Sequence, residues 1–476
     1  MTNEWKSIPT PKDLHDLYYH YELPLARAFY HIERRGVATD AVRLEELKGF
    51  LLAQLEDLAS LMSDKLSRHI AFSKLHAERM DWERKDYFNL ASPKDVATIL
   101  KSRGLVLPKN RLTHSETTGE DALNQLYAES GDQILMEVLR AREYSKILGT
   151  YVNAKLHDGI LYSAYRVTGT VTGRRSARKN LFGFGTNAQN LPKHSQLGHR
   201  FRRCIRARDG KILISCDQVQ AEDFIVSGLI ADIGGDFSGL RELQAGTDRH
   251  SRLASKLFNK PEAECGKNTI ERFMGKKTRH AGNYDMGHDE FARQLVKEGF
   301  TGFTPASCGD LLKIFHRESP GIKGIYHKWV QDQISSCRML RTPFARERVF
   351  LSARPYSDNR KVFKEAYAFD PQSTVGDNTG LSILSCELNN FGLVVMDSHD
   401  AATLEVDDNP SAVSLGVSLL NHSFTRDISF TNGLTIRIPI EFEIGYNLED
   451  TTSFKNTEDT LAAYRRCKEE NELHQD

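Results

Sequence analysis

Apolar positions recur with a helical period through the first third of the chain. Residues 17–38 follow this period and predict a helix that ends at Gly36. Thr39 or Asp40 is then placed to cap a long amphipathic helix. Its apolar face is expected to comprise Val42, Leu44, Leu47, Leu51, Leu55, Leu58 and Leu61.

More helix is predicted as far as residue 154. Ser92 is a good N-cap and Pro93 a good first helical residue. A polar loop covers residues 108–121, and a helical pattern then runs from about Ala122 to Ala154. The pattern by itself indicates a helical packing unit.

The pattern changes after residue 158. Lys211–Cys216 is a short apolar run that predicts a strand ending at Asp217. A helical, charge-rich stretch follows from about Ala221 to Val330. Both kinds of element are therefore expected in this part of the chain.

A β-hairpin is predicted towards the C-terminus. Its strands are Leu393–Met396 and Ala401–Val406, and the polar residues 397–400 join them. The last segment, residues 450–476, is polar and is expected to be a short helix or a frayed tail.

The bulk composition is that of an ordinary soluble protein. The 476 residues are 39% hydrophobic and 27% charged, which allows two to four domains. No run of about 18 apolar residues exists, and the N-terminus lacks the apolar core of a signal peptide. The seven scattered cysteines indicate reduced thiols, not a disulfide or zinc framework. A cytoplasmic protein without a membrane partner is expected.

The net charge is zero, but the cations are unevenly distributed. Between Arg166 and Arg208 there are eleven Lys or Arg residues and no Asp or Glu. Such a basic block can be a solvated surface. Here it is interleaved with Gly, Thr, Asn and Gln, which approach phosphates and sugars closely. This composition favours a site for a polyanion.

Asp217 and Asp400 are each expected where a strand ends. Nucleotidyl transfer uses two divalent ions roughly 3.5–4 Å apart, and magnesium prefers oxygen ligands, so two carboxylates on a rigid scaffold suffice. Taken singly, each aspartate is more often a turn former. Ser398, His399 and Asp400 also suggest a nucleophilic triad, but three contiguous residues cannot converge as that mechanism requires.

A cationic stripe is predicted on one helix. Arg272, Lys276, His280 and Tyr284 are four residues apart, and each step of four drifts only about 40° around a helix. They form one stripe about 18 Å long with no acid between its ends. Two cations, an imidazole and an aromatic ring suit a triphosphate followed by a sugar and base. A solvated helix face is the alternative.

With these motifs the chain resembles the DNA polymerase I family (family A), especially its phage members. CDQVQAEDF, around Asp217, is similar to the family's first metal-binding motif, D-Y-S-Q-I-E-L-R. The stripe fits R-x3-K-x3-(F/Y/H)-x3-Y-G, and MDSHDAATLEV resembles the V-H-D-E motif. Further signatures agree in order between about residues 17 and 448: FNLASPKDVATIL, TGRRS, NAQNLP and KEAYAFDPQSTVGD.

The resemblance implies a template-directed DNA polymerase that adds dNTPs to a primer 3′-hydroxyl. Asp217 and Asp400 would hold two Mg²⁺ ions, which Mn²⁺ can replace, with the Gln218 backbone carbonyl as an extra ligand at the nucleotide site. Arg272 and Lys276 would hold the triphosphate, and Lys276 would protonate the leaving pyrophosphate. The other nucleotide-binding positions would be His280 against the sugar and base, Tyr284 beneath the nascent pair, and Glu222, which crowds a ribose 2′-hydroxyl.

The resemblance also implies contacts with primer–template DNA. Arg174 and Gln372 match residues that contact the minor groove, where acceptors lie in similar places on every correct pair. The remaining DNA-binding candidates are Gln189, Asn190, Lys364 and His399.

Several positions depart from the family pattern. Gln218 replaces a Tyr, and residues 223–224 (Asp-Phe) replace Leu-Arg. Asp285 replaces the Gly that follows the stripe, and Ala401 replaces an acid, so a supporting carboxylate is missing. None of these changes removes a metal ligand, so activity is expected.

The fold implied by the resemblance is α+β, a right-hand polymerase fold with an antiparallel β palm, helical fingers and a helical thumb. The proofreading exonuclease that precedes the thumb in this family has no room here, so a separate exonuclease, like a processivity factor, is a candidate partner. The expected divisions are an N-terminal palm-associated segment (1–38), the thumb (39–155), the palm in two parts (156–235 and 376–448), the fingers (236–375) and a C-terminal tail (449–476).

Two other functions stay open at this point. A single-subunit RNA polymerase shares the architecture, but Glu222 should clash with a ribose 2′-hydroxyl. A non-catalytic DNA-binding relic would have no need to retain both Asp217 and Asp400. Comparing primer extension with deoxynucleotides and with ribonucleotides tests the RNA polymerase alternative. Measuring primer extension and DNA binding of Asp217→Ala tests the non-catalytic relic.

Overall fold

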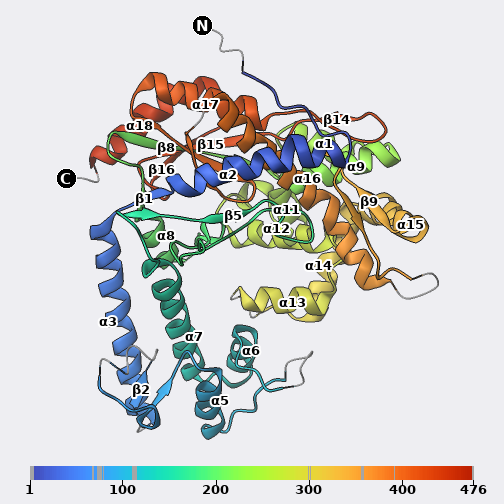
Figure 1. Cartoon of the computed structure of the whole chain (residues 1–476). Helices are drawn as coiled ribbons and strands as arrows, with labels where there is room; N and C mark the ends of the chain where they lie inside the picture. Colours follow the sequence, from blue (N-terminus) through green and yellow to red (C-terminus); the bar gives the residue numbers. More distant parts are fainter. Residues whose placement is uncertain are drawn as a thin grey trace.

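Three bodies of secondary structure make up the chain, as Figure 1 shows: a sheet with its covering helices, a helical lobe beside it, and a helical arm that projects away from the sheet. The structure is a computed structural model. It describes residues 5–66, 69–71, 78, 80–109, 115–193, 195–298, 300, 302–354, 359–390 and 392–473.

A five-stranded antiparallel sheet lies at the centre of the molecule, in the order β11-β12-β8-β15-β16. Ile212 and Ile214 of β8 belong to one hydrophobic core, and Leu213 between them belongs to another. Both faces of β8 are therefore covered, which fits its nearly continuous apolar run. The predicted strand and hairpin are confirmed as β8 (Lys211–Gln218), β11 (Val394–Asp397) and β12 (Ala401–Asp407), joined by β15 (Ile440–Gly445) and β16 (Thr451–Phe454).

Helices cover the sheet. α17 contacts β8 and β12, α2 contacts β11, and α16 packs against α9 and α2. The prediction that a helix ends at Gly36 is confirmed, because Gly36 is the C-cap with φ of 55°, a conformation that glycine adopts readily. The bounds are α1 (Leu14–Asp16), η1 (Leu17–Glu22), α2 (Leu23–Arg35), α9 (Ala221–Gly234), α16 (Arg360–Asn389) and α17 (Pro410–Phe424).

The C-terminal segment is not a frayed tail, so that alternative was wrong. β16 pairs with β15, and α18 (Thr460–Leu473) packs against α17 and β16. Ala463, Tyr464 and Cys467 are buried in the main core, and the Tyr464 hydroxyl donates to Asp408 at 2.7 Å. Apolar residues spaced along α18 hold the segment in place.

The arm is built on two long helices, α3 (Ala41–Leu66) and α7 (Gln133–Lys146), the latter extended by η3 (Ile147–Val152). The helical pattern predicted from about 122 to 154 is confirmed, but it is divided, because Gly131 adopts a left-handed φ of 68° and Asp132 caps α7 anew. Val42 and Leu61 are exposed, and Met62 is buried instead. The strands and helices at the tip of the arm are β2 (His69–Ala71), β3 (Tyr87–Asn89), α5 (Pro93–Ser102) and α6 (Glu120–Ser130).

The helical lobe confirms the predicted charge-rich helical stretch. α12 packs closely on α11, since a Cβ at Gly275 would lie 2.2 Å from the His250 carbonyl oxygen. In Figure 1 α13 of the lobe lies beside α6 of the arm, and the two helices are in contact. The lobe's helices are α10 (Ser238–Gln244), α11 (Arg249–Phe258), α12 (Ile270–Asn283), α13 (His288–Lys297), α14 (Pro305–Glu318) and α15 (Lys328–Ser336).

Among the described residues, no helix combines the length and the apolar character that crossing a bilayer requires.

Candidate functional site

Asp217 and Asp400 meet at one end of the central sheet. Asp217 is the second-last residue of strand β8, and Asp400 directly precedes β12. The strand register pairs Ala401 with Asp217, and the Gln218 backbone N–H donates to the Asp400 carbonyl oxygen at 3.3 Å. Both aspartates line one cavity of about 410 Å³. The tertiary structure therefore brings together the two residues predicted to bind metal.

The charge of Asp400 acts on Asp217. Desolvation by the surrounding cavity wall, and then the charge of Asp400, raise the pKa of Asp217 to about 7, although Asp217 keeps exposed surface. A cation held between the carboxylates would offset both effects. Carboxylate oxygens are also the ligands that magnesium prefers, so the donor set of Asp217, Asp400 and the Gln218 carbonyl fits a divalent ion.

A third carboxylate, which the sequence reasoning missed, lies beside this pair. Glu441 of β15 is directly opposite Asp217 in the sheet register and lines the same cavity. Lys455 lies 3.1 Å and Lys267 3.4 Å from its oxygens. Burial opposes ionisation, but these lysines lower the pKa of Glu441. The acid missing at position 401 thus has a spatial counterpart in Glu441 on another strand. The alternation of apolar and acidic residues over 440–445 (IEFEIG) could have indicated it.

The cationic stripe faces the carboxylates across the cavity. Arg272, Lys276 and His280 on α12 line the cavity, and Tyr284 is the buried residue that ends the helix. Thr269 caps α12, its hydroxyl accepting the Arg272 backbone N–H at 3.2 Å. The predicted grouping on one helix face is therefore present.

Two residues from the start of α11 join the stripe, and neither was predicted. The Asp248 carboxylate accepts from Arg272 Nε at 2.6 Å, so the absence of acids within the stripe is compensated from a neighbouring helix. His250 lines the cavity, and burial lowers the pKa of His250 to about 4. Its buried Nδ1 has no hydrogen-bond partner within the described structure. The segment that holds them has no periodic signal that would mark a site.

Glu222 connects the stripe to the sheet side of the cavity. Its carboxylate accepts from the Arg174 guanidinium and from the Tyr284 hydroxyl. Arg174 also donates to the Gln372 backbone carbonyl at 3.2 Å. Three residues expected to contact nucleotide or DNA are thus joined by hydrogen bonds around a single carboxylate.

The other DNA-binding candidates lie in different environments. The His399 carbonyl accepts from Arg175 at 2.8 Å, and the largely buried Gln189 donates to Asp397 at 2.9 Å. Gln189 therefore stabilises the end of β11, where the turn to β12 begins. Asn190 and Lys364 are exposed, and Lys364 lies two helical turns before Gln372 on α16.

The basic block is only partly available to a polyanion. Six of its eleven cations form internal ion pairs with acids: Arg174, Arg175, Arg202, Arg203, Arg206 and Arg208. Over the described part of the chain, the other five pair with no carboxylate: Arg166, Arg178, Lys179, Lys193 and Arg200. Folding uses half of the block to hold the structure together, which the sequence composition could not reveal.

Two departures from the family pattern have local explanations. Asp285 adopts φ of 51°, a left-handed conformation that glycine favours and that Asp tolerates better than most residues. Asp223 is buried and pairs with Arg249 at 3.0 Å and Arg279 at 3.5 Å. Its charge is therefore balanced by two arginines of the lobe, although it lines the same cavity as Asp217 and Asp400.

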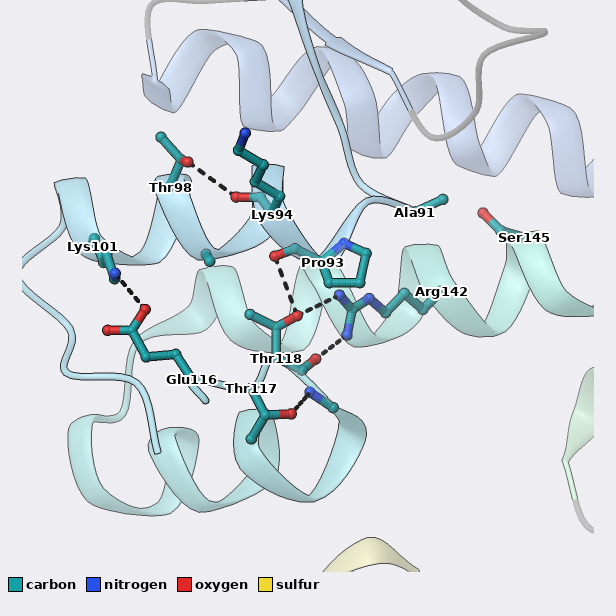
Figure 2. Close-up of a pocket in the computed structure, with 12 residues that line it drawn as sticks. Ala91, Pro93, Lys94, Thr98, Lys101, Glu116, Thr117, Thr118, Arg142 and Ser145 are labelled. Carbon is teal, nitrogen blue, oxygen red and sulfur yellow. Dashed lines mark hydrogen bonds and ion pairs between the residues drawn. The ribbon is translucent and has the colours of Figure 1, made fainter. Parts of the chain in front are cut away.

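Another cavity, of about 810 Å³, lies in the arm (Figure 2). In its wall Lys101 pairs with Glu116, and Arg142 donates to the Thr118 carbonyl and hydroxyl oxygens. Lys94 is a further, exposed lining residue. None of the expected site residues lines this cavity, which is separate from the one around Asp217.

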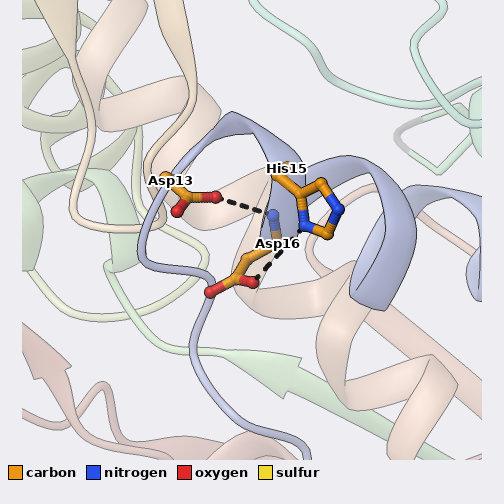
Figure 3. Close-up of side chains that lie close together, drawn as sticks. All are labelled: Asp13, His15 and Asp16. Atoms are coloured by element: carbon orange, nitrogen blue, oxygen red, sulfur yellow. Dashed lines mark hydrogen bonds and ion pairs between the residues drawn. The ribbon is translucent and has the colours of Figure 1, made fainter.

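One group in the described part of the chain has the ligand spacing of a metal site: Asp13, His15 and Asp16 (Figure 3). Asp13 is the N-cap of α1 and accepts from the Asp16 backbone N–H at 2.8 Å. Helix capping explains this cluster.

Comparison with known proteins places the site in a family. The profile of DNA polymerase family A matches residues 56–450. Thermostable DNA polymerase I of Thermus thermophilus is 25% identical over 454 residues, covering 92% of this chain and 48% of the relative. DNA polymerase I of Deinococcus radiodurans is 25% identical over 441 residues, covering 90% and 41%. The chain spans about half the length of the curated relatives it matches.

A solved structure is similar in fold. The polymerase domain of Pol1 from M. smegmatis, in complex with DNA primer–template and dNTP, has a TM-score of 0.73 at 20% identity, covering 91% of this chain and 71% of that one. The predicted α+β right-hand fold is confirmed by this likeness. Since the family profile covers most of its length, this chain belongs to DNA polymerase family A.

Proposed function

We propose that this chain is a template-directed DNA polymerase that adds dNTPs to a primer 3′-hydroxyl. The supporting observation is one cavity in which Asp217 and Asp400 lie opposite Arg272 and Lys276. Carboxylates at one wall and cations at the other suit a nucleoside triphosphate bound through divalent ions. Relatives in the family bear the name DNA polymerase I.

Asp217 and Asp400 would hold two Mg²⁺ ions, or Mn²⁺ in their place, with the Gln218 carbonyl as a further ligand. When bound, such ions activate the attacking oxygen and stabilise the leaving oxygen. The chain's own contribution is a rigid pair of strand ends that keeps both carboxylates side by side.

α12 would bind the nucleotide. Arg272 and Lys276 lie one helical turn apart and would hold the triphosphate, with Arg272 exchanging the Asp248 carboxylate for a phosphate oxygen. Lys276 would donate a proton to the pyrophosphate as it leaves. His280 and Tyr284, whose rings are 5.0 Å apart, would flank the sugar and base.

Glu222 would select deoxynucleotides. Its carboxylate is fixed from two sides by Arg174 and Tyr284, so it cannot swing away easily from an additional 2′-hydroxyl. Arg174, Gln372 and His399 would face the primer–template, with Gln189, Asn190 and Lys364 as further candidates.

The domain assignment is also part of the proposal. The central sheet would be the palm, the helical lobe the fingers and the arm the thumb, with boundaries near residues 39, 156, 236 and 376. A separate exonuclease, a processivity factor and a cytoplasmic location stay predictions.

A primer-extension assay tests the proposal. With Mg²⁺ and dNTPs, the wild-type chain should extend a recessed primer, and with ribonucleotides it should not. Asp217→Ala should reduce extension by at least about a thousandfold, because the ion site is lost. Asp407→Ala, at the far and exposed end of β12, is the matched control and should extend normally. Extension that survives Asp217→Ala unchanged would contradict the metal role.

A further inference from the structure

A second groove lies between α2, the β5–β6 hairpin and the loop that follows β6. It is formed beside β5 (Ala164–Arg166) and β6 (Ser176–Arg178), and Figure 1 shows α2 and β5 side by side, in agreement with their contacts. The cavity measures about 740 Å³. We call it the aromatic groove, from its main lining residues: Tyr30, Tyr162, Phe182, Phe184, Arg34 and Arg178.

Large apolar side chains of this groove are open to solvent. Leu181 is 89% and Phe182 81% exposed, and Tyr30 is 55% exposed. These three side chains gather around one cavity, unlike isolated exposed apolar residues, which need no explanation. A gathered apolar surface around a concavity usually marks a binding site.

Cations lie on the same rings. The Arg34 guanidinium lies 5.5 Å from the Tyr30 ring centre and donates to the Tyr30 hydroxyl at 2.9 Å. Lys155 Nζ lies 4.1 Å from the centre of the Phe184 ring, and Arg178 is an exposed lining residue. The combination of flat rings and nearby cations is typical of surfaces that stack unpaired bases and neutralise their phosphates.

The groove's acids form no ion pair with Arg34 or Arg178 in the described structure, although the charge of Arg178 acts on Glu33. Glu33 lines the groove, but its carboxylate accepts the Tyr165 backbone N–H, so it is turned toward the hairpin. Asp158 lies beside His157, which is at the groove's edge. The cations Arg34 and Arg178 remain at the surface.

One chain segment links the groove to the proposed polymerase site. Arg174 contacts Glu222, Arg175 binds Asp397 at 2.8 Å, and β6, which follows directly, ends at Arg178 in the groove. Four residues of extended chain separate Arg174 from Arg178 by at most about 14 Å. Tyr165, a lining residue, also accepts the Asp397 backbone N–H at 3.3 Å.

We propose that the aromatic groove binds single-stranded DNA, holding unpaired nucleotides of a strand at the edge of the polymerase site. Duplex DNA fits less well, because its bases are stacked on each other and offer no free faces to Phe182 and Tyr30. A purely apolar peptide fits less well, because Arg34 and Arg178 would lose water without gaining a partner. Only the nearness to the DNA path rests on the proposed polymerase function.

The test compares two DNA forms. Binding of fluorescein-labelled oligo-dT and of a blunt duplex is followed by fluorescence anisotropy for wild type and for the double variant Tyr30→Ala/Phe182→Ala. Loss of two stacking rings should weaken oligo-dT binding about tenfold or more. Duplex binding, and extension of a recessed primer whose 3′ end is fully paired to its template, should stay within about twofold. Tyr18→Ala, an exposed tyrosine of the same N-terminal helical segment, is the matched control and should change neither.

The outcomes separate the alternatives. Unchanged oligo-dT binding, or an equal loss for oligo-dT and duplex, would overturn the proposal. If oligo-dT binding depends on the two rings but the wild-type chain does not extend primers, the groove proposal is supported and the polymerase function is rejected. Phe182→Trp keeps a ring and provides a second readout: oligo-dT should quench its additional fluorescence, measured against the wild-type background of three tryptophans. No quenching at DNA concentrations that saturate anisotropy would count against the groove.

Discussion

Arg272 and Lys276 lie one turn apart on α12, yet their surroundings differ. Arg272 is paired with Asp248, whereas Lys276 is exposed and pairs with no carboxylate in the described structure. An unpaired cation facing two carboxylates is ready to take a phosphate without first breaking an ion pair. At the scale of residues, Lys276 is therefore the group on which nucleotide binding should depend most.

Lys276→Ala should reduce single-turnover dNTP incorporation by about a hundredfold or more, because it removes charge from the transferring triphosphate. Primer–template affinity, measured by anisotropy, should change by less than about threefold. The neighbouring Lys277, which pairs with Glu298, supplies the control variant Lys277→Ala. Equal losses of incorporation and DNA affinity in Lys276→Ala would contradict a triphosphate role.

A second residue-scale prediction concerns pH and stability. Asp370 is buried in α16, where burial raises the pKa of Asp370 to about 7, despite the Thr374 hydroxyl donating at 2.9 Å. The folded chain thus retains this proton at pH values where the unfolded chain has lost it, and Asp370 costs increasing stability as pH rises from about 4 to 7.

Asp370→Asn should remove this cost. At pH 8 its free energy of unfolding should exceed that of wild type by up to about 4 kcal/mol, and its melting temperature should be higher. Both differences should vanish near pH 4. Asp332→Asn on the exposed side of α15 is the control. Parallel pH profiles of melting temperature for Asp370→Asn and wild type would show that Asp370 does not titrate in this range.

At the scale of elements, the segment that follows residue 450 contributes to the wall of the cavity around Asp217. Residues 451–473 lie beyond the family match, which ends at residue 450. β16 adds a fifth strand to the sheet, and Lys455, directly after it, reaches Glu441 beside Asp217. An element beyond the profile match thereby supplies a cation to the cavity.

Lys455→Ala should raise the KM for dNTPs about two- to fivefold, because Glu441 would lose a counter-charge next to the triphosphate site. DNA affinity should not change. Lys468→Ala on α18, where the lysine lies 3.7 Å from Asp408, tests whether any lysine of the segment has the same effect. Steady-state kinetics on one primer–template distinguishes the two variants, and an unchanged KM in Lys455→Ala would remove this lysine from the site.

At the scale of the whole molecule, charge is divided between holding the fold and binding a polyanion. Ion pairs such as Arg175–Asp397 and Arg208–Glu405 join segments that are far apart in sequence. Only cations without such partners can neutralise phosphates and release counterions from DNA. The salt dependence of DNA binding should therefore follow the unpaired members of the basic block.

Lys193→Ala should reduce the slope of log affinity against log salt by about 1. Lys193 is exposed, and it is close enough to the cavity for its charge to oppose part of the rise in the pKa of Asp217. Arg203→Ala, which breaks the pair with Asp450, should leave the slope unchanged. Anisotropy titrations between about 50 and 200 mM salt measure both. A wild-type affinity that is flat with salt would place the whole block away from DNA.

The sequence by itself determined the local elements and the chemistry they present. The apolar run of β8, the Ser92–Pro93 helix start and the four-residue spacing on α12 all depend on neighbours in the chain, and the structure has each of them. Local signals failed where tertiary packing decides. Burial of Met62 instead of Leu61 depends on which face of α3 meets α7.

Only the tertiary structure decided which distant charges become partners. Asp217 and Asp400 meet because β8 and β12 pair antiparallel, and Glu441 joins them because β15 pairs with the other edge of β8. The same folding neutralises Arg272 with Asp248 while leaving Lys276 unpaired. Such partnerships arise from long-range strand and helix packing, because a side chain's charge is in the sequence but the group that balances it lies wherever the fold brings it.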